Sequence, residues 1–249
     1  MKIFLIASLL IASLHASTIT IAVAANVSFA IESLKTAFKK QYPQTNVRVI
    51  LGSSGKLTAQ ISNGAPYGLF MSANMAYPNA LYKQGVATTK PVVYAKGALA
   101  LLSVRERDFS QGLALLKNAN IHRIAIANPH TAPYGKAAKE ALQNARLYQK
   151  LLPKFVYGES IAQTFSYTLR ATDIGIIAQS LLYSPKMAHF KQHKNWVSVD
   201  KKFYMPIKQG IVLLKNVPNK KEYQKFYDFV LSKKAKTILH HYGYITEVF

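Results

Sequence analysis

The 249-residue chain contains no cysteine, and this absence removes several classes of protein at once. Without a thiol there is no disulfide framework, no thiolate metal site and no cysteine nucleophile. Acidic residues are also scarce, with 10 Asp and Glu against 32 Lys and Arg, which gives a net charge of +22. Half of the residues are apolar, a fraction too high for a disordered basic tail. The composition therefore indicates a packed protein of one large domain or two smaller ones.

The large positive charge suggests a polyanionic partner such as nucleic acid, but the kind of basic residue argues against it. Only six of the basic residues are arginines, and arginine is the side chain that best recognises phosphates and bases. The lysines are scattered, with no run longer than two. We therefore expect no nucleic-acid partner. A cationic surface protein that binds polyanions by charge alone stays an alternative function.

The first 16 residues, MKIFLIASLLIASLHA, have the pattern of a secretory signal peptide. Lys2 provides the positive start, an apolar stretch follows, and Ala16 offers a small residue before a cut. The segment is too short to span a bilayer comfortably, although an uncleaved anchor stays the alternative. Export to the periplasm agrees with the absence of cysteine, because an unpaired thiol is a liability there.

After this segment, apolar β-branched runs alternate with stretches of helical spacing, which predicts mostly parallel sheets flanked by helices. The expected strands are residues 18–25, 47–51, 69–72, 98–104, 121–127, 155–157, 173–177 and 205–214. The expected helices are residues 28–42, 56–63, 77–84, 112–117, 135–146, 160–170 and 220–241.

This order of elements suits two α/β lobes with a ligand cleft between them. The chain is expected to cross between the lobes near 94–97 and to return near 206–210. The predicted division is a signal peptide over 1–16, a first lobe over 17–96 plus 209–249, and a second lobe over 97–208.

Four loops that follow an expected strand and precede an expected helix are rich in small and hydroxylic residues. They are 24–28 (AANVS), 52–55 (GSSG), 128–135 (NPHTAPYG) and 158–161 (GESI). In open α/β sheets such loops gather at the carboxyl ends of the strands, where ligands bind. Each helix start presents unpaired N–H groups and a positive dipole end. Taken singly, these residues are most often helix caps, but four such loops together predict a site for an anion.

Several segments, in order along nearly the whole chain, resemble the periplasmic molybdate-binding proteins of ABC transporters. The most specific are SSGKL, NGAPYGLFMSA and PYGKAAKEAL, with ITIAVAANVSF near the start and KAKTILHHYGY near the end. The resemblance implies the type II periplasmic binding-protein fold, with a tetrahedral oxyanion held between two lobes by neutral donors. It implies capture of molybdate or tungstate and delivery to an ABC permease, by a monomer without a cofactor. Another tetrahedral oxyanion, such as sulfate, stays an alternative ligand.

Carried onto this chain, the resemblance implies four oxyanion-binding residues. Asn26 takes the position of a hydroxyl or amide donor, and Ser54 that of a serine whose hydroxyl and N–H both face the anion. Tyr134 and Ile161 stand at positions that contribute backbone N–H groups. Ser53 is a further candidate beside them.

One position departs from the family pattern. Some members bind with a tyrosine hydroxyl where this chain has Ala178. Gln179 beside it and the hydroxyl of Tyr134 are the candidates to replace that donor. Glu159 is the one acidic residue in the four loops, and we expect it to point to solvent at its helix start.

Catalysis and metal binding are not expected. Ser53 and Ser54 lie in GSSG, which is not the G-x-S-x-G pattern of a nucleophile elbow. His130 is the only histidine in a candidate loop, and His189 and His193 have i, i+4 spacing but no third ligand. We therefore expect a protein that holds an oxyanion by hydrogen bonds and performs no chemistry on it.

Overall fold

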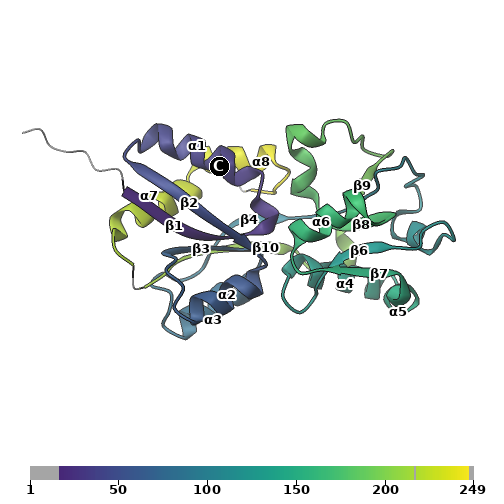
Figure 1. Cartoon of the computed structure of the whole chain (residues 1–249), viewed down its shortest axis with the longest axis horizontal. Coiled ribbons are helices and arrows are strands. Elements are labelled where there is room, and N and C mark those ends of the chain that lie inside the picture. Colours follow the sequence, from purple (N-terminus) through teal and green to yellow (C-terminus); the bar gives the residue numbers. More distant parts are fainter. Residues whose placement is uncertain (1–16, 216, 247–249) are drawn as a thin grey trace, which may run out of the picture.

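The computed structural model describes residues 17–215 and 217–246, and the expected signal peptide lies outside the described residues. Two lobes lie side by side along the long axis of the molecule (Figure 1), and each is built on a five-stranded sheet. In each sheet one strand runs against the other four, so each sheet is mixed, with two parallel and two antiparallel strand pairs. The two-lobed α/β fold expected from the sequence is confirmed.

The first lobe has the strand order β2-β1-β3-β10-β4. Its strands are β1 (Ser17–Ala24), β2 (Thr45–Gly52), β3 (Leu69–Ser72), β4 (Val92–Gly97) and β10 (Ile207–Leu213). Its helices are the short η1 (Ala25–Val27), α1 (Ala30–Gln41), α2 (Ser54–Ser62), α3 (Ala76–Lys83), α7 (Lys220–Leu231) and α8 (Lys233–His241).

The second lobe has the strand order β7-β6-β8-β5-β9. Its strands are β5 (Leu99–Leu102), β6 (Ile124–Ala127), β7 (Phe155–Gly158), β8 (Ile174–Ala178) and β9 (Trp196–Ser198). Its main helices are α4 (Pro133–Asn144), α5 (Tyr148–Leu151) and α6 (Ile161–Arg170), and η4 (Gln179–Tyr183) follows β8. No helix of the described residues in either lobe is long and apolar enough to cross a membrane.

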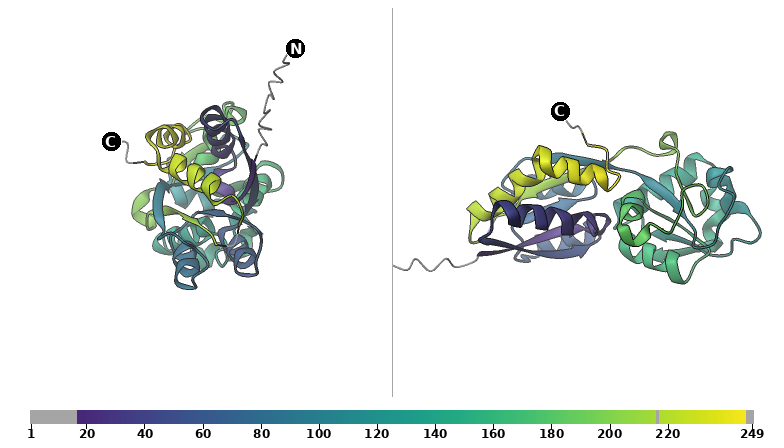
Figure 2. Two further views of the ribbon diagram at one scale, coloured as in Figure 1. Left: turned by 90° about the vertical axis from the view of Figure 1, so that its left-hand side faces the viewer. Right: turned by 90° about the horizontal axis from the view of Figure 1, so that it is seen from above.

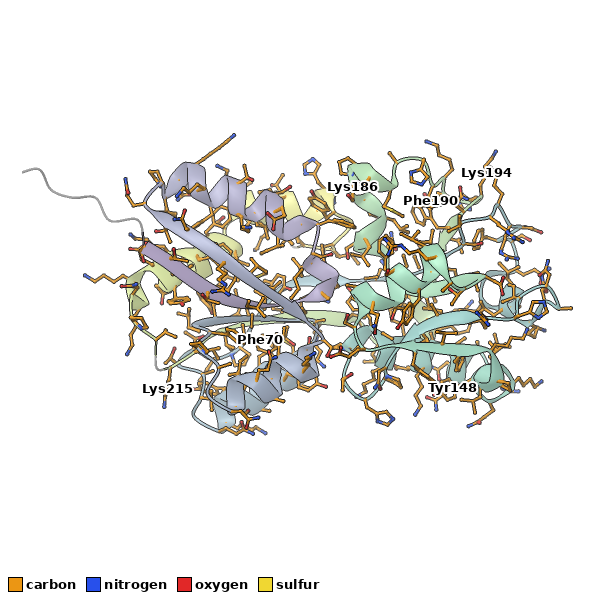
Figure 3. All side chains as sticks on the ribbon, viewed as in Figure 1. Phe70, Tyr148, Lys186, Phe190, Lys194 and Lys215 are labelled. Atoms are coloured by element: carbon orange, nitrogen blue, oxygen red, sulfur yellow. The ribbon has the colours of Figure 1, made fainter. Side chains whose placement is uncertain are left out.

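Side chains of the first sheet alternate between two helical layers. On β1, Ile19, Ile21 and Val23 pack with α1, α7 and α8, whereas Ala22 packs with α2 and α3. Phe70 of β3, labelled in Figure 3, belongs to the second of these cores. A strand alternates its side chains between faces with a period of two, and here both faces are covered. This is why these strands are apolar almost throughout.

One helix expected from the sequence is in fact two. Apolar periodicity predicts a single helix over 220–241, and this prediction is wrong because α7 ends at Leu231 and α8 begins at Lys233, with Ser232 between them. The backbone of Ser232 is extended, and its Oγ accepts a hydrogen bond from the Ala235 N–H at 3.3 Å. A serine that caps a new helix in this way interrupts a helix even where the apolar pattern continues. The sequence also does not predict β4 and β9, which are edge strands with partly exposed residues.

The chain crosses between the lobes twice. It leaves β4 at Gly97 and enters β5 at Leu99, and it returns from β9 to β10 through residues 199–206. Figure 2 shows the two lobes from above as separate bodies joined by these connections. Two short connections between compact lobes are the arrangement that permits a ligand cleft between them.

Candidate functional site

Parallel pairing brings the small-residue loops to a common edge in each lobe. Ala24 of β1 pairs with Gly52 of β2, and Ala127 of β6 pairs with Gly158 of β7. The paired strands therefore end level with one another, and their following loops emerge side by side. This edge is where ligands bind in open α/β sheets.

A small cavity, with room for about 10 Å³ of water-sized volume, lies where these two edges meet. It is bounded by the loops after β1, β2 and β3 in the first lobe and by those after β6 and β7 in the second. The lining residues are Ala24, Ala25, Asn26, Gly52, Ser53, Ser54, Ala73, Ala132, Pro133, Tyr134 and Ile161. None of these residues carries a charge. Nor does the described part of the chain place three or more His, Asp or Glu side chains together as a metal site.

The structure brings all four predicted residues, Asn26, Ser54, Tyr134 and Ile161, to this cavity, and each is at most 4% exposed. Ser54, Tyr134 and Ile161 occupy the first or second position of α2, α4 and α6. Their N–H groups have no carbonyl one turn earlier to bond, so they are available to a ligand. Pro133 has no N–H, which leaves that of Tyr134 as the first donor of α4. Three helix starts thus converge on one uncharged cavity.

The two adjacent serines have different roles. Ser53 caps α2, because its Oγ accepts a hydrogen bond from the Lys56 N–H at 3.3 Å. The Oγ of Ser54 accepts from the Ala73 N–H at 2.9 Å. A hydroxyl that accepts one hydrogen bond retains its hydrogen as a donor. The hydroxyl of Ser54, which lines the cavity, is therefore free to donate to an acceptor there.

Ala73 is a lining residue that the sequence does not reveal. It follows β3, and its side chain is a methyl group without any polar signal. Only the position of β3 beside β1 in the sheet brings the backbone of Ala73 to the cavity.

Asn26 is held by three residues that are distant in sequence. Its Nδ2 donates to Gln209 Oε1 at 2.9 Å and to Tyr244 Oη at 2.7 Å. The backbone carbonyl oxygen of Asn26 accepts hydrogen bonds from Ser180 Oγ at 3.0 Å and from Tyr244 Oη at 2.9 Å. We call Asn26, Ser180, Gln209 and Tyr244 the buried network. Both hydrogens of the Asn26 amide are used within it, so the side-chain donor expected from the sequence is engaged by the protein itself.

The hydroxyl of Tyr134 lies beside the first crossing between the lobes. A Cβ atom at Gly97 would overlap with Tyr134 Oη, so the absence of a side chain at Gly97 admits this ring. Oη is buried and has no hydrogen-bond partner among the described residues. Burial raises the pKa of Tyr134 well above its usual value, and the nearby hydroxyls of Tyr244 and Tyr94 act in the same direction. The group is therefore a neutral hydroxyl at neutral pH.

Neither Ala178, the position of the missing tyrosine, nor Gln179 lines the cavity, so Tyr134 is the one of the two candidate donors that does. Ala178 is the last residue of β8 and is fully buried opposite Leu99. The amide of Gln179 donates to Tyr183 Oη at 3.1 Å and accepts from Ser198 Oγ at 3.0 Å, within the second lobe.

Two backbone carbonyls of the second lobe accept hydrogen bonds from the first lobe at the mouth of the cleft. The Gly55 N–H donates to Thr131 O at 2.9 Å. The Tyr77 hydroxyl donates to His130 O at 3.3 Å. These bonds connect the start of α2 and the side of α3 to the loop before α4, so the cleft is closed in this structure.

An ion pair also crosses the mouth. Lys56 Nζ lies 2.9 Å from Glu159 Oε1, with both side chains about half exposed. Glu159 is exposed to solvent, as expected, and it also pairs with Lys56 because the starts of α2 and α6 face each other across the cleft. We call this pair and the two hydrogen bonds of Gly55 and Tyr77 the rim contacts.

The net positive charge lies outside the cavity. Lys186, Lys194 and Lys215 are exposed, and Figure 3 shows them at the surface of the molecule. No lysine or arginine lines the cavity itself. The charge can therefore attract anions over a distance without contacting a bound one.

Comparison with known proteins gives consistent matches over most of the chain. Residues 19–245 match the family described as bacterial extracellular solute-binding protein. The chain is 34% identical over 244 residues to the molybdate-binding protein ModA of Azotobacter vinelandii, covering 96% of this chain and 94% of the relative. It is 32% identical over 234 residues to ModA of Rhodobacter capsulatus, covering 93% and 90%. The solved periplasmic molybdate-binding protein of A. vinelandii matches with a TM-score of 0.85 at 32% identity, covering 91% of this chain and 98% of that one.

Proposed function

The chain belongs to the bacterial extracellular solute-binding protein family, and from this premise we propose that it captures molybdate, or tungstate, in the periplasm and delivers it to an ABC permease. The observation that carries the proposal is the small uncharged cavity on which three helix starts and the Ser54 hydroxyl converge. Such a site presents donors from several directions, which suits a tetrahedral anion.

The proposed site holds a dianion with neutral groups alone. Hydrogen bonds to a charged acceptor are stronger than those between neutral groups, so several backbone N–H donors and one hydroxyl are sufficient. A buried lysine would need compensating partners of its own. Because Ser54 belongs to the first lobe and Tyr134 and Ile161 to the second, a bound anion connects the lobes and favours the closed cleft.

Selection among oxyanions follows from the same lining. No carboxylate lines the cavity, so a protonated anion such as hydrogen phosphate lacks a strong acceptor for its proton. An unsatisfied buried donor costs about 1–3 kcal/mol. Sulfate carries no proton at neutral pH, so its smaller size is the feature by which the cavity distinguishes it.

The remaining parts of the chain take the roles expected of such a carrier. We propose that residues 1–16 direct export and that 17–96 plus 209–249 close as one unit against 97–208. The protein acts as a monomer and performs no reaction on the anion, since the lining offers neither a base nor a nucleophile paired with one.

Calorimetric titration of the exported protein with molybdate, tungstate, sulfate and phosphate, in high salt, tests the proposal directly. We expect binding of molybdate and tungstate, with sulfate and phosphate weaker. High salt suppresses attraction that depends only on surface charge, so it removes binding to a generally cationic surface. A folded sample that releases no heat with any of the four anions would overturn the proposed function.

A further inference from the structure

We infer that Gln209 and Tyr244 are positioning residues for the oxyanion site, holding Asn26 and the loop 24–26 in the geometry that binds the anion. This inference rests on the proposed function of the cavity. Neither residue lines the cavity, and both act through their hydrogen bonds to Asn26.

The loop that carries Asn26 has little structure of its own. Its helix η1 spans three residues, has no side-chain cap, and ends with a Ser28 N–H to Ala25 O bond of 3.3 Å. A single helical turn is not stable by itself, because the entropy of ordering it exceeds what one hydrogen bond returns. The position of this wall of the cavity must therefore come from contacts with the rest of the fold.

Gln209 determines which way the Asn26 amide faces. Its own Nε2 donates to Ile207 O at 3.0 Å, which leaves Oε1 as the atom directed at Asn26. An acceptor there requires Asn26 to present Nδ2, and Asn26 Oδ1 is buried without a hydrogen-bond partner among the described residues. The pairing of β10 with β4 shifts by one residue between Gln209 and Gly210, which leaves Tyr94 as the extra residue of a bulge. A bulge changes the direction of nearby side chains. Gln209 lies next to this bulge and is fully buried.

Tyr244 brings the C-terminal segment into the same network. Its hydroxyl both donates to the Asn26 carbonyl and accepts from the Asn26 amide. The segment is attached to β4 by two backbone bonds between Lys96 and Ile245, of 2.8 and 2.9 Å. Tyr244 is 1% exposed, so its hydroxyl is shielded from bulk solvent. Asn26 is thus fixed by β10 and by the C-terminal segment, and Ser180 adds a bond from the second lobe.

A double-mutant cycle on molybdate affinity tests the role of Gln209. Gln209→Met keeps the length of the side chain and removes both of its hydrogen bonds. We expect Gln209→Met to weaken binding about 10-fold in the wild-type background, a size typical of residues that orient ligand-binding groups. Because Gln209 acts on the loop through the side chain of Asn26, the same substitution should change affinity less than about 2-fold when Asn26 is already Ala. Equal losses in both backgrounds would overturn the inference, since they would indicate a general packing effect.

A second pair of variants keeps the test decisive if Gln209→Met does not fold. Tyr244→Phe removes a hydroxyl that makes two bonds to Asn26, whereas Tyr94→Phe removes a buried hydroxyl nearby that has no partner among the described residues. We expect Tyr244→Phe to weaken molybdate binding about 10-fold and Tyr94→Phe to change it less than about 2-fold. Equal affinities for the two variants would overturn the inference while leaving the proposed function intact. A wild-type protein that binds none of the four oxyanions would overturn both.

Discussion

The cleft is closed by two sets of contacts, the rim contacts at its mouth and the buried network at its inner end. The rim contacts include an ion pair, Lys56 with Glu159, whose side chains remain about half exposed. The buried network consists of neutral side chains, and its members are at most 5% exposed. Both sets join the two lobes, since Ser180 of the second lobe reaches Asn26 of the first.

The rim contacts include charged groups and the buried network does not, because water reaches the rim but not the inner end of the cleft. An exposed ion pair is solvated and screened, and it contributes only about 0–1 kcal/mol. The same charges placed at the inner end would lose several kcal/mol of hydration each. Neutral amides and hydroxyls avoid this cost while still fixing direction through their hydrogen bonds. We therefore expect the inner end to determine how well the anion fits, and the rim to influence how readily the cleft opens.

The largest expected effect is a loss of folding stability when a methyl group is added at Gly97, at the inner end of the cleft. Gly97→Ala places a Cβ against Tyr134 Oη, so this side chain, which is only 1% exposed, must shift. Overpacking of this kind typically destabilises by about 1–3 kcal/mol, and we expect the upper part of that range. Chemical denaturation measures the change in the free energy of unfolding.

A second substitution, at Tyr134, tests whether the overlap with its hydroxyl causes the loss of stability in Gly97→Ala. Tyr134→Phe removes the overlapping oxygen, which has no hydrogen-bond partner among the residues described. Gly97→Ala combined with Tyr134→Phe should therefore recover part of the lost stability, since the ring carbon Cζ and Gln209 Nε2 remain close to the added methyl group. No recovery in the double variant would mean that the contact of Gly97 with this ring is not what constrains the inner end.

The next largest effect is expected on molybdate affinity, from a substitution in the cavity between the rim contacts and the buried network. Ser54→Ala removes a hydroxyl that is free to donate and should weaken molybdate binding by about 1.5–3 kcal/mol, as expected for a hydrogen bond to a charged group. Ser53→Ala removes the cap of α2 and should instead lower the unfolding free energy by about 0.5–2 kcal/mol. Calorimetric titration and thermal unfolding separate the two results. An unchanged affinity for Ser54→Ala would exclude its hydroxyl from the site.

A smaller effect is expected at the rim. Glu159→Gln removes the ion pair across the cleft and should weaken molybdate binding by no more than about 1 kcal/mol, mainly through faster release. Glu106→Gln is a matched control, because it removes an exposed pair with Lys194 that lies within the second lobe. Stopped-flow release rates at low and high salt measure the effect. A loss as large as that of Ser54→Ala would contradict the division of roles between rim and inner end.

The smallest expected effect is that of pH near neutrality on folding stability and molybdate affinity. Burial raises the pKa of Tyr94, Tyr134 and Tyr244 above the usual value of a tyrosine. Their folded-state pKa values exceed the unfolded ones, so the stability they contribute is complete below about pH 10 and is lost as the pH rises further. We expect molybdate affinity to be constant between about pH 6 and pH 9. Above about pH 10, Tyr94→Phe should reduce the slope of stability against pH by about 1.4 kcal/mol per unit. An unchanged slope would show that Tyr94 titrates as an exposed tyrosine.

Much of the first lobe and most of the site loops could be predicted from local patterns. The buried face of α1 consists of the apolar residues at Ala30, Ile31, Leu34, Ala37 and Phe38, because helical spacing places them on one side. Local patterns failed where a single residue changed the geometry, as at Ser232, where an apolar period continues across a break between two helices.

By itself, the order of the amino acids determined that small and hydroxylic loops precede α2, α4 and α6, and therefore that free N–H groups and an uncharged lining were available for an anion. These features depend on residues a few positions apart. Only the tertiary structure decided that the Asn26 amide bonds to Gln209 and Tyr244, which are 183 and 218 positions away. It also decided that Glu159 pairs with Lys56 across the cleft. The physical reason is that a hydrogen-bond or ion-pair partner is selected by the order of strands in a sheet and by the approach of the two lobes, and neither leaves a periodic signal in the sequence.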